Sequence, residues 1–225
     1  IAHFERALAL LKDVPDESER IRYEADLLSR LGWSLAESRG YTAPEVEITF
    51  LRARELGAQA GQAGQVFNVQ RHDYTLFGLH HFYAQTGDHR AGHELAQELL
   101  TLAERVQHPE LLWRAHFAVA ETAFYAGELI SARDQLERAL ALSASPGSSG
   151  NSDALGLLAM TLWPLGYPAQ AVQRSHEAIA AAQVLRRPFS LAQAFMYSAV
   201  VHVFARNGHT AGEQADAGLA LAREN

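Results

Sequence analysis

The chain has 225 residues, a formal net charge of −7 and no cysteine. The negative charge argues against broad contact with a nucleic-acid backbone, which requires clustered cationic side chains. The missing cysteines exclude disulfides, thiolate nucleophiles and cysteine-ligated metal centres. A hydrophobic content of 48% is typical of a folded globular protein, and no apolar run reaches the about 20 residues that a membrane-spanning helix requires.

Residues 1–12 open the chain as half of a helix pair. Phe4, Ala7, Leu8 and Leu11 recur at the three-to-four spacing of an amphipathic helix. The sequence therefore starts inside a helical pattern, and no signal peptide is visible in it. We expect it to be a fragment of a longer protein.

Five glycines then punctuate the chain at nearly constant intervals of 47, 40, 39 and 42 residues. Each follows an apolar helical stretch, at the position where a left-handed residue ends a helix. An internal period of this length is the signature of a repeat protein. The glycines are Gly40, Gly87, Gly127, Gly166 and Gly208.

Each glycine separates two different helical faces. The face before it is apolar, and the face after it carries small residues, which allow two antiparallel helices to cross closely. The pattern is clearest around Gly127 and Gly166 and loosest around Gly208, where the alanine register slips by a residue or two. The small-face residues are Ala132, Leu136 and Ala139 after Gly127, and Ala171 and Ala178 after Gly166.

Residues typical of helix starts agree with this division into helix pairs. Thr42 and Glu45 form a capping box with Pro44 in the first turn, and Pro109 and Pro188 stand near the starts of two further helices. Residues 143–152 are rich in serine and glycine and predict a long loop between repeats. No sustained period-two alternation predicts a strand.

These patterns predict an all-α protein of tandem antiparallel helix-pair repeats. The spacing of apolar residues, turn glycines and alanines is typical of tetratricopeptide-like (TPR-like) repeats. We expect residues 1–225 to form a single right-handed superhelical solenoid, with a half repeat at 1–12 followed by about five helix pairs of roughly 40 residues each.

Two segments add a resemblance to this pattern. Residues 40–47 (GYTAPEVE) with 52–56 (RAREL), and residues 187–192 (RPFSLA) with 202–204 (HVF), resemble the C-terminal tails of bacterial multidomain signalling proteins. The domain order in proteins of that kind is an N-terminal class III nucleotidyl cyclase, kinase or DNA-binding module, then a STAND-type AAA ATPase, then a TPR-like tail, which is the part that this chain resembles. The resemblance implies a cytoplasmic sensor or scaffold tail, with any catalytic domain outside this chain. More distantly, the chain resembles the helical sugar-sensing region of maltotriose-responsive transcription activators.

The first helix of a TPR-like pair lines the concave groove, at positions offset from its packing face. Counting from the turn glycines, these positions are rich in rings. We expect several of them to bind a ligand or partner and others to turn inward as core. The predicted groove residues are Trp33, Tyr74, Phe77, His81, Arg114, Phe117, Glu121, Phe124, Tyr125, Met160, Trp163, His202 and Arg206.

The composition and motifs favour binding over catalysis. Lys12 is the only lysine, and the sequence has no phosphate-binding loop, so we expect no enzyme activity and no cofactor or metal site. The first hypothesis is a scaffold that binds a peptide or protein segment, including a domain of its own parent protein. The alternative is a sensor of a small effector such as a sugar. Neither involves nucleic acid or a membrane.

Overall fold

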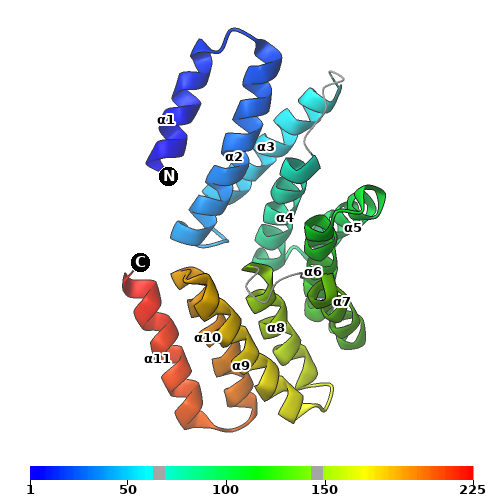
Figure 1. Ribbon diagram of the computed structural model, residues 1–225, viewed down its shortest axis with the longest axis vertical. Coiled ribbons are helices and arrows are strands. Elements are labelled where there is room, and N and C mark those ends of the chain that lie inside the picture. The colour runs from blue at the N-terminus through cyan, green and yellow to red at the C-terminus, as the bar shows by residue number, and fades with distance from the viewer. Residues whose placement is uncertain (63–68, 143–148, 225) are drawn as a thin grey trace. The chain divides into compact units, whose positions relative to one another are not determined.

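The described residues of the chain are helical and contain no strand, which confirms the predicted fold class (Figure 1). A computed structural model describes residues 1–62, 69–142 and 149–224. Among these residues, no helix is both long and apolar enough to cross a bilayer. The helices are α1 (Ala2–Leu10), η1 (Leu11–Asp13), α2 (Glu17–Arg39), α3 (Pro44–Gln62), α4 (Val69–Thr86), α5 (His89–Val106), α6 (Pro109–Tyr125), α7 (Leu129–Leu142), α8 (Ser149–Leu162), α9 (Pro168–Leu185), α10 (Pro188–Phe204) and α11 (Gly208–Glu224).

From α2 onward the helices form antiparallel pairs, each with a first and a second helix (Figure 1). Polar contacts join the two helices of three pairs. His80 Nδ1 hydrogen-bonds to a carbonyl oxygen of α5 at 3.0 Å, and His116 Nδ1 lies 2.7 Å from Gln135 Oε1 of α7. Ser152 Oγ donates to the carbonyl oxygen of Ala178 at 3.1 Å. Packing divides the chain into two compact units, Ile1–Leu102 and Ala103–Asn225, which we describe separately.

Three helices begin at the predicted prolines. Pro44 opens α3, Pro109 opens α6 and Pro188 opens α10, because a fixed backbone φ and a missing N–H cost nothing in the first turn. The loop predicted for residues 143–152 is wrong over its last part, since α8 begins at Ser149. The rest of that prediction, residues 143–148, lies outside the described residues.

Four of the five predicted turn glycines have the left-handed backbone that the turn requires. The φ angles are 93° at Gly40, 85° at Gly87, 78° at Gly127 and 88° at Gly166. The fifth prediction is wrong, because the left-handed residue is Arg206, with a φ of 54°. Gly208 instead begins α11.

Backbone hydrogen bonds at the turns fix the true repeat register. The amide after the left-handed residue donates to a carbonyl five residues back: Glu128 to Ala123, Tyr167 to Leu162, and Asn207 to His202. His202 is therefore equivalent to Leu162 and Ala123. The corrected interval between the last two turns is 40 residues, which removes the slip seen around Gly208.

Phe50 organises the core of the first unit. It lies on α3 with 1% of its surface exposed. A Cβ added to Gly32 of α2 would lie 2.6 Å from the ring, and a Cβ added to Gly78 of α4 would overlap it. The two glycines therefore allow α2 and α4 to approach the ring of one phenylalanine closely.

In the second unit, small residues fill the crossings as the sequence predicts. Ala132, Leu136, Ala139, Ala171 and Ala178 are completely buried on the second helices. Further along, Ala178 and Ala182 of α9 pack with Ala194 of α10. The methyl side chains of the alanines let neighbouring helices come close without leaving a cavity.

Candidate functional site

The predicted groove residues divide between the two units. Trp33, Tyr74, Phe77 and His81 belong to the first unit, and the other nine belong to the second. We therefore describe two candidate surfaces, each built from the first helices of its own unit.

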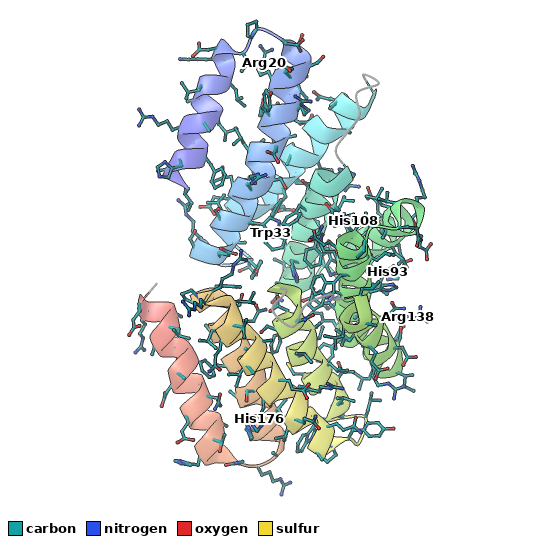
Figure 2. The ribbon with its side chains drawn as sticks, viewed as in Figure 1. Arg20, Trp33, His93, His108, Arg138 and His176 are labelled. Carbon is teal, nitrogen blue, oxygen red and sulfur yellow. The ribbon has the colours of Figure 1, made fainter. Side chains whose placement is uncertain are left out.

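Trp33 is the centre of a ring cluster in the first unit (Figure 2). Its ring centroid lies 6.2 Å from that of Tyr74, 5.8 Å from that of Phe77 and 5.9 Å from that of His81. The indole Nε1 donates to the carbonyl oxygen of Tyr74 at 3.2 Å, which fixes the orientation of the tryptophan between α2 and α4. The structure thus brings together all four residues that the sequence places in this part of the groove.

The cluster has a buried base and an accessible rim. Phe77 is buried and belongs to the core, whereas Trp33 and His81 are half-buried and Tyr74 is 46% exposed. Tyr41, which the groove prediction missed, lies 5.5 Å from the His81 ring and 6.2 Å from the Trp33 ring. Tyr41 directly follows the turn glycine Gly40, and this position in the sequence could have indicated that its ring lies near the groove.

Three predicted groove residues of α6 are buried in the second unit. Arg114 is 7% exposed, Phe117 is 1% exposed and Glu121 is 3% exposed. Phe117 stacks on Trp113, with ring centroids 5.2 Å apart. These residues pack among helices, so none of them forms an accessible groove wall in this structure.

The rings at the ends of the first helices are more accessible. Phe124 is half-buried and contacts Tyr125, which is 42% exposed, with centroids 5.6 Å apart. In the equivalent region of the next pairs, half-buried Trp163 lies 6.3 Å from Phe204, which is also partly exposed. The groove prediction missed Phe204 because it follows Val203 in a helix that is apolar on nearly all sides.

Two other predicted residues, Met160 and Arg206, lie on the same unit. Met160 is half-buried on α8. Arg206 is exposed at the turn that follows α10, where it takes the left-handed conformation. Arg206 is therefore a turn residue as well as a possible surface contact.

His202 does not lie on an open groove. It is 7% exposed and occupies the position of the core residue Leu162, because the true turn residue is Arg206 and not Gly208. Neither ring nitrogen has a hydrogen-bond partner among the described residues. Burial lowers the pKa of His202, and the ring of His176, 5.9 Å away on α9, lowers it further.

Tyr197 of α10 links three first helices of the second unit. Burial raises the pKa of its hydroxyl well above the ordinary value, and the carboxylates of Asp153 on α8 and Glu121 on α6 raise it further. Gln193 Nε2 donates to the hydroxyl oxygen at 3.3 Å. The phenol is therefore neutral at physiological pH and has acidic groups beside it. Across the described part of the chain, no group of three or more His, Cys, Asp or Glu side chains is placed to hold a metal ion.

The exposed apolar residues differ between first and second helices. Among the described residues, four of the five exposed rings lie on first helices, and the fifth, Tyr167, precedes α9. The exposed apolar residues of the second helices are all aliphatic, and the first helix α10 also has two exposed aliphatic residues, Met196 and Val203. The four first-helix rings are Tyr23, Tyr74, Tyr125 and Phe204; the second-helix residues are Ile48, Leu51, Val106, Ile130, Val184 and Leu219.

Comparison with solved structures supports the predicted repeat fold. BtubC (BKLC) from P. vanneervenii is 16% identical with a TM-score of 0.66, over 99% of this chain and 89% of that one. A putative kinesin light chain from Podosopora anserina with TPR-like repeats is 18% identical with a TM-score of 0.54, over 93% of this chain and 98% of that one. No protein-family model and no curated protein matches the sequence.

A third similar structure is larger than this chain. It is a signal transduction ATPase with numerous domains (STAND) from Pyrococcus horikoshii with a tetratricopeptide repeat sensor, 16% identical with a TM-score of 0.56. The match covers 97% of this chain and 35% of that one. At these identities the likeness concerns the fold, and the fold is that of TPR-like helix-pair repeats, as the sequence predicts.

Proposed function

We propose that this chain is a protein-interaction scaffold whose first helices bind a peptide or protein segment. The observation that carries the proposal is that, among the described residues, four of the five exposed rings lie on first helices and none lies within a second helix. Aromatic side chains are enriched at binding hot spots because they bury a large area and lose little conformational entropy.

We further propose that the scaffold regulates catalytic domains of a larger bacterial signalling protein, and that it is cytoplasmic and not itself an enzyme. Two observations support this role. The fold is similar to that of part of the STAND ATPase with a tetratricopeptide repeat sensor. Independently, residues 40–47 and 187–192 resemble the tails of bacterial signalling proteins of that kind.

Selection from a displayed random-peptide library tests the binding proposal. The parent chain should enrich peptides with a shared apolar motif, and Tyr125→Ala should weaken their binding. Ile130→Ala is the matched control, because Ile130 is 64% exposed but lies on the second helix α7. Equal loss of affinity in both variants, or enriched peptides without any shared motif, would overturn the proposed face.

A further inference from the structure

A second candidate binding site lies in the first unit, away from the ring cluster. It is a cavity of about 530 Å³, open to solvent, that is lined by residues of α1, η1, α2 and α3. Half-buried Leu8, Leu11 and Leu28 form its apolar part. A volume of this size falls within the range of about 300–1,000 Å³ that holds a small organic ligand.

The helix register explains why these side chains converge. Arg20, Glu24 and Leu28 are spaced by four residues along α2, so they form one stripe of that helix. Leu8, on α1, and the neighbouring η1 residues face this stripe from the opposite side, and Arg52 of α3 completes the lining. Figure 2 shows Arg20 at the N-terminal end of α2, beside the connection from α1.

The apolar part of the cavity is incompletely covered by protein. No residue of α1 is buried, although the helix is amphipathic and Leu8 lines the cavity beside α2. Removing apolar surface from water is favourable, so an apolar group that displaces water from this surface binds with a gain in free energy. The leucines therefore provide a site for a hydrocarbon group.

The charged part of the lining is cationic. Lys12, Arg20 and Arg52 outnumber the single acidic residue, Glu24, in a chain whose net charge is −7. Among the lining residues, this excess of positive charge favours an anionic ligand by charge complementarity.

The existing ion pairs leave these cations available. Lys12 makes no ion pair with any described residue. Arg20 lies 3.8 Å from Glu17, whose side chain is 78% exposed, and Arg52 lies 3.7 Å from Glu24. The stronger pair, 2.6 Å between Arg52 and Glu55, is also at the surface. Exposed ion pairs contribute little to stability, so an anion bound between the cations competes with them at little cost.

We propose that this cavity binds a small amphiphilic anion, in which a carboxylate or phosphate is attached to an apolar chain or ring. The apolar part contacts Leu8, Leu11 and Leu28, and the anionic group contacts Lys12 and Arg20. The site is separate from the rings that carry the proposed interaction function, and neither proposal depends on the other.

Calorimetric titration of the full chain with octanoate, below its micelle concentration, tests this site. Octylammonium is the matched probe, because it has the same hydrocarbon chain and the opposite charge. Octanoate should bind measurably more tightly than octylammonium, and added salt should weaken its binding because the charges are near the surface. Equal binding of the two probes, or no binding of octanoate, would overturn the proposal.

Charge variants locate the binding. The double variant Lys12→Gln, Arg20→Gln should weaken octanoate binding by about tenfold, as expected for the loss of two partly exposed charge contacts. The control, Arg30→Gln with Arg39→Gln, removes two charges from the same unit at exposed ion pairs outside the cavity. An equal loss in the control would contradict the assigned site. So would binding of an acidic peptide in place of octanoate, because that result would make the cavity a protein contact.

Discussion

Gly156 of α8 and Tyr197 of α10 are fitted to each other: a Cβ added to Gly156 would overlap the Tyr197 ring. The phenol is buried, and its hydroxyl accepts a hydrogen bond from Gln193. The glycine therefore allows an aromatic residue of one pair to pack against the first helix of the preceding pair, at the usual entropic cost of a helical glycine.

This relationship predicts the effect of Gly156→Ala. Alanine is the better helix former by about 1 kcal/mol, but the added methyl group collides with the ring and requires repacking, which typically costs about 1–3 kcal/mol. We expect a net loss in the free energy of unfolding, measured by denaturant titration. Gly212→Ala is the control: a Cβ there meets nothing within 4 Å, so it should stabilise α11. A gain in both variants would show that Tyr197 does not occupy this position.

Replacing His202 should stabilise the protein. Its two ring nitrogens are buried without hydrogen-bond partners among the described residues, at a position where the preceding pair has Leu162. His202→Leu removes this desolvation cost and should raise the free energy of unfolding by about 1–3 kcal/mol. A lower melting temperature in this variant would mean that the His202 imidazole makes a stabilising contact in the folded protein.

The lowered pKa of His202 also predicts a pH dependence. In the unfolded chain a histidine titrates near ~6.5, whereas burial makes the folded imidazole bind its proton only at lower pH. Between the two pKa values the unfolded state holds more protons. Protonation of this histidine therefore does not affect the free energy of unfolding above about pH 6.5. Below that pH the free energy of unfolding decreases, until the pH has fallen through the folded pKa.

Melting curves at neutral and mildly acidic pH measure this dependence. The drop in melting temperature on acidification should be smaller in His202→Leu than in the parent. Ser198→Ala is the control, because it removes another buried polar atom without a partner but no titratable group. An unchanged drop in His202→Leu would contradict the assignment to this histidine.

The buried rings and the surface rings should differ in their effect on stability. Phe117 is 1% exposed, so Phe117→Ala should cost about 3–5 kcal/mol, as large-to-small changes in a core do. Tyr125→Ala should cost much less, because nearly half of that side chain is already in water. Chemical denaturation of the two variants checks the distinction, and similar losses would place Tyr125 in the core.

The repeat architecture could be predicted from the sequence because its signals are local. Turn glycines, prolines in first turns and alanines at crossings each have a direct backbone or packing reason. The last turn escaped prediction because Arg206 takes a left-handed conformation that glycine usually supplies. Counting from Gly208 therefore shifted the register by two residues and placed His202 on the groove.

Other parts of the site depend on packing that one sequence does not reveal. The helices α8 and α10 are apolar on most sides, so periodicity alone does not separate core positions from accessible ones. Phe117 and Phe124 occupy the same helix seven residues apart, yet the first is core and the second is half-buried. The cavity beside α1 combines residues from three α-helices and η1, and no single motif indicates it.

The central claim is that the rings of the first helices bind a partner, and Trp163→Ala tests it most directly. For a peptide selected on the parent chain, we predict that this variant weakens binding by about 2 kcal/mol or more, while its melting midpoint falls less than that of Phe117→Ala. Ile130→Ala should leave both quantities near those of the parent. A stability loss as large as that of Phe117→Ala, or an unchanged peptide affinity, would contradict the claim.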